Sequence, residues 1–148
     1  MAVKTRWYEA DSRFIPGHYQ PATLIDLALS RDIDSHRLLR GTGLFHEDIL
    51  AGTARLSPQQ FLGLIGNSRK WLDADDSSFL FGQRLLPGYY GAASHALGHA
   101  QNLHQALEIL IQQQVLLSPL VTLQLELDEH HAYLYWLDSC GAGEHWRF

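Results

Sequence analysis

Apolar residues recur at helical spacing along the first two thirds of the chain. Pro21 suits the first turn of a helix, and apolar residues then repeat every three or four positions, which predicts a short amphipathic helix ending near Arg31. These apolar residues are Leu24, Ile25, Ala28 and Leu29. Asp34 is placed to cap a second short helix carrying Leu38 and Leu39, which ends at Gly41 because glycine readily adopts positive φ.

Two later helices begin with capping signals. In the stretch Ser57-Pro58-Gln59-Gln60, the serine oxygen can accept the amide of Gln60, and the Gln60 side chain can reach back to the serine. Asn102 and Gln105 have the same spacing. Each cap precedes an apolar stripe that we expect to be buried: Phe61, Leu64, Ile65 and Leu72, and then Leu103, Ala106, Leu107, Leu110, Ile111 and Leu117, before Pro119.

The segment between these two helices is interrupted by glycine and proline. Residues 79–90 begin as an apolar helix that breaks at Pro87-Gly88, and a short element from Gly91 to about Leu97 ends at Gly98.

The hydrophobic period changes to two near the end of the chain. Val121, Leu123, Leu125 and Leu127 alternate with polar residues, residues 128–130 suit a turn, and residues 131–137 return as an aromatic-rich strand. A hairpin with one apolar face needs helices to pack on it. We therefore predict an α+β fold, with a mainly helical N-terminal two thirds packed on a small antiparallel hairpin.

These elements suggest one folded unit preceded by an arm. Residues 1–20 mix charges with aromatic side chains and contain Pro16-Gly17, which favours an extended N-terminal arm or leading strand. We expect residues 21–148 to form the domain proper. Because Trp146 and Phe148 are bulky and no stop signal precedes them, we also expect the natural chain to continue.

Composition and charge exclude several classes of protein. The 148 residues are 46% hydrophobic and carry a net charge of −5, which fits one globular domain and does not favour phosphate-backbone binding by this segment. The basic residues are scattered, and Arg37 with Arg40 comes nearest to a patch. No apolar run is long enough for a membrane helix, so we expect a cytoplasmic protein without membrane contacts. Cys140 is the only cysteine, which rules out an intrachain disulfide.

Histidines and aromatic residues provide the candidate chemistry. His95 and His99 have the i, i+4 spacing of metal ligands, but the acid of a His-Glu-x-x-His motif is absent and Gly98 interrupts the helix, so we predict no metal site. The paired aromatics Tyr89-Tyr90 and Tyr133, Tyr135 and Trp136 suit either the lining of an organic-ligand pocket or an ordinary core. We interpret Cys140 as a loop thiol, with a nucleophilic or redox role as the alternative.

Three blocks between Leu39 and Leu117 resemble the N-terminal effector-binding domain of AraC-type transcription regulators. The first is Gly43-Leu44 followed by Arg55-Leu56-Ser57-Pro58-Gln59-Gln60-Phe61. The second is Phe81-Gly82-Gln83-Arg84-Leu85 followed by Pro87-Gly88-Tyr89-Tyr90-Gly91. The third runs from Gly91-Ala92-Ala93-Ser94-His95-Ala96-Leu97 into Asn102-Leu103-His104-Gln105-Ala106-Leu107. The blocks are similar to the arabinose-binding-like group, as in ornithine-utilisation regulators.

The resemblance implies a sensing module rather than an enzyme. Such a domain binds a small-molecule effector without a cofactor and forms a homodimer, while a C-terminal pair of helix-turn-helix motifs, absent from this chain, contacts DNA. For the effector we predict contacts with Phe81, Tyr90, His95, Tyr133 and Trp136, which combine apolar bodies with polar groups. We expect the effector to enter between the hairpin and the helices and to shift a conformational equilibrium.

Two other functions remain open from the residues alone. One is a small metal-dependent enzyme that uses His95, His99 and an acid not identified in the sequence. The other is a pure dimerisation module that binds no small molecule.

Overall fold

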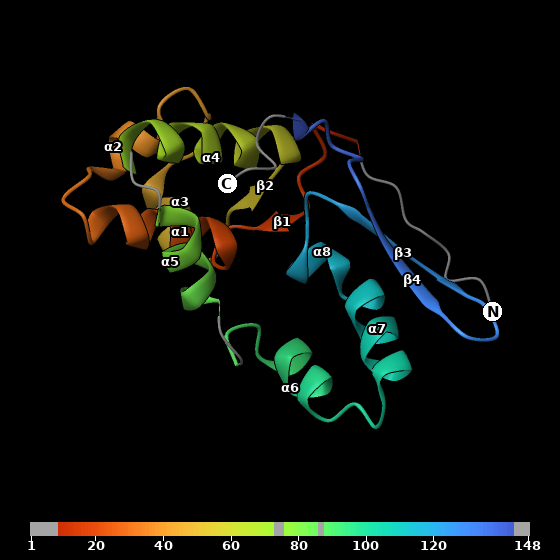
Figure 1. Ribbon diagram of the computed structural model, residues 1–148. Coiled ribbons are helices and arrows are strands. Elements are labelled where there is room, and N and C mark those ends of the chain that lie inside the picture. The colour runs from red at the N-terminus through yellow and green to blue at the C-terminus, as the bar shows by residue number, and fades with distance from the viewer. Residues whose placement is uncertain (1–8, 73–75, 86–87, 144–148) are drawn as a thin grey trace.

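The computed structural model describes residues 9–72, 76–85 and 88–143. Within these residues the chain forms helices and two small antiparallel sheets, which confirms the predicted α+β class (Figure 1). In chain order, the elements are β1 (Ile15–Pro16), α1 (Gln20–Leu29), α2 (Ser35–Leu39), α3 (His46–Leu50), β2 (Arg55–Leu56), α4 (Pro58–Leu72), α5 (Ser77–Arg84), α6 (Ala92–Gly98), α7 (Leu103–Gln112), α8 (Gln114–Leu117), β3 (Thr122–Leu127) and β4 (Ala132–Leu137).

The main hydrophobic core belongs to the first half of the chain. Helices α1, α2 and α4 pack on one another, and the buried core cluster runs from Ile15 to Leu72. Leu24, Leu38 and Leu64 are fully buried. The apolar stripe predicted after Ser57 is confirmed, since Phe61, Leu64, Ile65 and Leu72 all belong to this cluster.

The end of the predicted N-terminal arm contributes to the same core. Ile15 is only 1% exposed and pairs with Leu56, so that β1 and β2 form a short antiparallel sheet. Gly17 fits closely here, because a Cβ at this position would lie 3.0 Å from Cβ of Ala54. The described part of residues 1–20 therefore packs with the helices.

Side-chain caps define the starts of α2 and α4 as predicted. The Asp34 carboxylate accepts the amide of His36 at 2.8 Å. At α4 the capping box is complete: Ser57 Oγ accepts the Gln60 amide at 3.2 Å, and Gln60 Oε1 accepts the Ser57 amide at 3.1 Å. Helix α3 was not predicted from the sequence. It is short and has no side-chain cap, which leaves little signal in the sequence beyond buried Ile49.

Helix α7 differs in part from the predicted stripe. Asn102 Oδ1 caps it by accepting the Gln105 amide at 2.9 Å, but Gln105 Oε1 accepts the amide of Gln101 instead of closing a box with Asn102. The helix ends at Gln112, and α8 follows as a separate turn. Leu103 is 72% exposed, and Ile111 is the buried residue of α7. The predicted burial is confirmed for Ile111 and wrong for Leu103, while the other residues of the stripe, Ala106, Leu107, Leu110 and Leu117, are half-buried.

The predicted hairpin is present as β3 and β4, and it extends away from helices α1–α5 while α7 lies beside it (Figure 1). Its register pairs Leu123 with Trp136, Leu125 with Leu134 and Leu127 with Ala132. Directly paired residues share a face, so these residues form one apolar face of the hairpin. Tyr133 pairs with Glu126 on the opposite face.

We expect truncations on the two predicted stripes to have different effects on stability. Leu64→Ala should lower the free energy of unfolding by about 2–5 kcal/mol, because it removes a fully buried side chain. Leu103→Ala should change it by less than about 0.5 kcal/mol, because Leu103 is largely exposed. Urea unfolding measures both. Equal losses in the two variants would contradict this difference in burial between Leu64 and Leu103.

Candidate functional site

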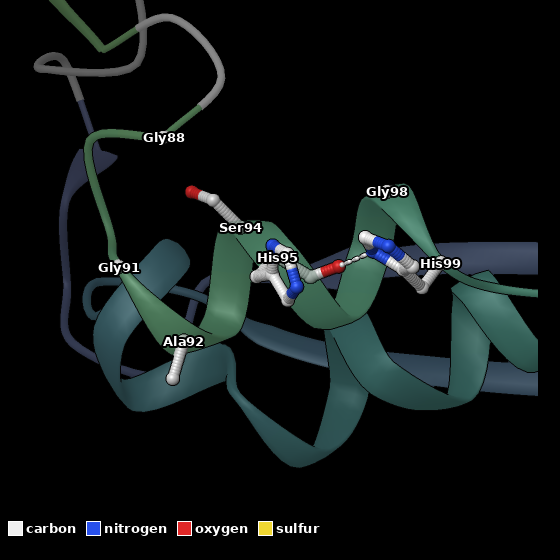
Figure 2. A pocket seen from close by; sticks show the side chains of 7 residues that line it. All are labelled: Gly88, Gly91, Ala92, Ser94, His95, Gly98 and His99. Carbon is white, nitrogen blue, oxygen red and sulfur yellow. Dashed lines mark hydrogen bonds between the residues drawn. The ribbon is translucent and has the colours of Figure 1, made fainter.

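A hollow of about 660 Å³ lies along α6 and the loop before it. Figure 2 shows the glycine, alanine, serine and histidine residues that line it: Gly88, Gly91, Ala92, Ser94, His95, Gly98 and His99. This volume is within the range of small-molecule sites. The third sequence block of the resemblance supplies most of these residues.

Three glycines line this hollow. Gly88 and Gly91 have φ values of +99° and +55°, which favour glycine over any residue with a Cβ. A Cβ added at Gly88, Gly91 or Gly98 would meet no atom within 4 Å, so the space beside each of them is open. Ser94 Oγ accepts the amide of Tyr90 at 3.1 Å and thereby holds the loop against the first turn of α6.

His95 and His99 lie side by side along α6, with ring centroids 4.1 Å apart (Figure 2). His99 Nδ1 donates to the carbonyl oxygen of His95 at 2.9 Å, which leaves Nε2 of the neutral His99 ring as an acceptor. Both residues are exposed. Among the described residues, no group of three or more histidine, cysteine, aspartate or glutamate side chains is arranged to hold a metal ion.

Three tyrosines next to the hollow form an aromatic cluster that binds to α1. The centroids of the Tyr89 and Tyr90 rings are 5.0 Å apart, and each ring lies within 6 Å of Tyr19. Gln20 Nε2 donates to the Tyr90 hydroxyl at 2.7 Å and to the carbonyl oxygen of Leu117 at 3.0 Å. The hydroxyls of Tyr89 and Thr23 are hydrogen-bonded to each other. The loop before α6 and the end of α8 are thus both joined to α1.

Burial changes the acidity of both tyrosines. Loss of solvent raises the pKa of Tyr89, and its hydrogen bond to Thr23 opposes this rise. Loss of solvent also raises the pKa of Tyr90, against the hydrogen bond from Gln20. Both phenols therefore stay protonated and keep their hydrogen bonds to a higher pH than free tyrosine.

The structure places the predicted effector contacts in different surroundings. His95 lines the hollow, and buried Tyr90 lies behind it in the tyrosine cluster. Phe81 packs against the core of the first half. Tyr133 and Trp136 are 44% and 56% exposed and lie on opposite faces of the hairpin, so one ligand on one face contacts only one of them. Helix α7 lies between α6 and the hairpin (Figure 1).

Several residues of this region were not predicted from the sequence. Nothing in the sequence marked Gln20 or Thr23 as a partner of the tyrosines. Gln20 was assigned to the end of the N-terminal arm, and Thr23 lies in a segment that was predicted only to be helical. Ser94 was noted only within a sequence block. For Gly88 and Gly91 the sequence suggested turn or close-packing roles; their positive φ values agree with turns, whereas close packing is wrong because a Cβ at either position would meet open space.

Cys140 has the environment of an unreactive thiol. Burial raises its pKa, the hydrogen bond with Ser139 opposes this effect, and the Asp138 carboxylate adds to it. The thiolate is the nucleophilic form, so this environment supports a loop thiol over a catalytic one.

Residues 33–145 match the family described as the arabinose-binding domain of AraC transcription regulator, N-terminal. The match covers most of the chain, including α6, the hollow and the hairpin. The chain belongs to this family. The AraC arabinose-binding domain is a regulatory effector-binding domain and not an enzyme. The match does not distinguish the ornithine-utilisation subgroup.

Searches of curated proteins and of solved structures found no match. In the described part of this AraC-type domain, no helix is long and apolar enough to cross a membrane. Gln20 and Thr23, which hold the tyrosine cluster, precede the segment that matches the family.

The raised tyrosine pKa values predict a loss of stability at alkaline pH. In the unfolded chain a tyrosine ionises near a pKa of about 10, while Tyr89 and Tyr90 stay protonated to higher pH in the fold. Their contribution to stability is therefore complete below pH ~10 and is lost as the pH rises through the folded pKa. A Tyr89→Phe, Tyr90→Phe double variant should lose less stability in urea unfolding above pH ~10 than the wild type does.

The exposed Tyr133 provides the control for this measurement. A Tyr133→Phe variant should show the same alkaline loss as the wild type, because it leaves the buried cluster intact. An unchanged alkaline loss in the double variant would contradict the assignment.

Proposed function

We propose that this chain is the ligand-sensing and dimerisation module of an AraC-type transcription regulator, with its effector bound in the hollow along α6. The observation that carries the proposal is the hollow itself, which has open glycine surfaces, the Ser94 hydroxyl and two imidazoles at its lining. The family match supports binding of a small molecule. We further propose that a C-terminal helix-turn-helix domain outside this chain contacts DNA, and that the regulator acts in the cytoplasm.

The surroundings of α6 provide a route for a binding signal. On one side, the loop before α6 is joined to α1 through Tyr89 and Tyr90. On the other side, α6 contacts α7, and α7 contacts β3 of the hairpin. A ligand that favours one arrangement of α6 shifts the population toward that arrangement, and the hairpin moves with α7.

The residue roles follow from this placement. His95 is the first effector contact that we propose, and Tyr90 positions the loop behind it. Phe81, Tyr133 and Trp136 stay predictions from the sequence. The hairpin supports the dimerisation role, because Leu127 and Trp136 lie on one apolar face, are each more than half exposed, and such apolar surface marks interaction sites.

Thermal unfolding tests the effector site. An amino acid, polyamine, sugar or fatty acid present at about 100 times its dissociation constant should stabilise the chain by ~2.7 kcal/mol, a rise of several degrees in Tm. His95→Ala should abolish this rise. His104→Ala should retain it, because exposed His104 lies on α7, outside the hollow, and pairs with Glu108.

Two outcomes would contradict the effector proposal. One is a rise in Tm that survives His95→Ala unchanged. The other is stabilisation by divalent metals alone, which would favour the metal-enzyme alternative.

Sedimentation velocity tests the hairpin as a dimer surface. The double variant Leu127→Ser, Trp136→Ser removes two large side chains from one apolar face and should weaken dimerisation by at least about tenfold. Phe45→Ser is the matched control, because Phe45 is 71% exposed and precedes α3, in the first half of the chain. A wild type that stays monomeric, or a double variant that dimerises normally, would rule out this surface.

A further inference from the structure

A second hollow, of about 680 Å³, lies between α2 and α4, among the elements of the helical core. Its lining is basic and aromatic: Arg37, Arg40, Asn67, Lys70 and Trp71. Among the described residues, no acidic side chain lines it. This is notable for a chain whose net charge is −5.

The three cations of this hollow are not neutralised within the described residues. Arg31 pairs with Asp76, but neither Arg37, Arg40 nor Lys70 forms an ion pair with a described acid. Each of them is near the C-terminus of its helix, where a cation interacts favourably with the helix dipole. The helix dipole explains why each cation lies where it does on its own helix. It does not explain why cations from two helices line one hollow with an exposed aromatic ring.

Contacts within the hollow hold two of these cations in place. The Arg37 guanidinium carbon lies 4.6 Å from the centre of the Trp71 ring, and Lys70 Nζ lies 5.7 Å from it. Both distances are in the range of cation–π interactions, which leave the N–H groups of the cations free to bind an anion. Trp71 is 39% exposed, so its ring is also accessible to a ligand.

Asn67 fixes the distance between the two sides of the hollow. Its Nδ2 donates to the carbonyl oxygens of Leu38 and Arg40 at 2.6 and 2.9 Å, which joins the end of α2 to α4. Leu38 and Leu64, behind this surface, are fully buried. The basic groups therefore lie on two helices that pack on the main hydrophobic core.

We propose that this second hollow binds the phosphate group of a small metabolite. Arginine guanidinium groups match phosphate oxygens in a bidentate geometry, and lysine adds a point charge. The hollow exceeds the size of one phosphate, which leaves room for an organic part next to Trp71. A small ligand fits better than a nucleic acid, because nucleic-acid binding relies on a longer basic surface. The site is separate from the hollow at α6 and does not depend on the function proposed there.

Isothermal titration calorimetry of the 148-residue chain at fixed ionic strength tests the site. AMP should bind, and adenosine, which lacks the phosphate, should not. The double variant Arg37→Gln, Arg40→Gln should weaken AMP binding by roughly tenfold or more. Arg55→Gln, which removes an exposed arginine elsewhere, should leave it unchanged. Because all three arginines are exposed, these variants should stay folded, and loss of the Arg37–Trp71 contact should lower Tm by a few degrees at most.

Further titrations distinguish the source of the phosphate. Tighter binding of AMP than of inorganic phosphate, reduced by Trp71→Leu, assigns the site to an organic phosphate. Equal affinity for both, insensitive to Trp71→Leu, assigns it to free phosphate.

Three results would overturn the proposal. The first is no binding of AMP, inorganic phosphate or pyrophosphate. The second is binding that is unchanged in the double variant. The third is displacement of AMP by a short DNA duplex at equal phosphate concentration, which would make the surface a nucleic-acid contact. The His95→Ala variant should bind AMP normally, which separates this test from that of the α6 hollow.

Discussion

The side-chain amide of Gln20 joins the two halves of this molecule. It donates to the Tyr90 hydroxyl before α6 and to the carbonyl oxygen of Leu117 at the end of α8. The buried core cluster ends at Leu72, and of the later residues Leu80, Phe81 and Leu120 pack against it from partly buried positions. A net hydrogen bond contributes only about 1 kcal/mol. The Tyr89–Thr23 hydrogen bond and the contacts of both tyrosines with Tyr19 add to this junction.

The position of the α6 hollow follows from this junction. Because Tyr89 and Tyr90 are held against α1, the glycines on either side of them, Gly88 and Gly91, turn the chain into α6 with positive φ. The open space beside these glycines is part of the hollow. A change in the tyrosine contacts would alter both the shape of the hollow and the start of α6, where Ser94 holds the loop.

Much of the fold was predictable because its signals are local. The caps at Asp34 and Ser57 act over two and three residues, and the alternation in the hairpin specified both strands. Burial was less predictable, since the spacing of Leu103 and its neighbours shows which residues share a face but not what covers it. The opposite faces of Tyr133 and Trp136 were available from strand alternation, because their numbers differ by three. The link from Gln20 to Tyr90 spans 70 positions and has no local signal.

The uneven burial of the two halves supports a division of roles within the domain. The first half buries a full set of leucine and isoleucine side chains and carries the basic hollow on α2 and α4. In the second half, Leu103, Leu127 and Trp136 are more than half exposed, and the hairpin has only two strands. Such a hairpin is marginally stable alone. Binding of the proposed effector or of a second copy would therefore stabilise the second half more than the first.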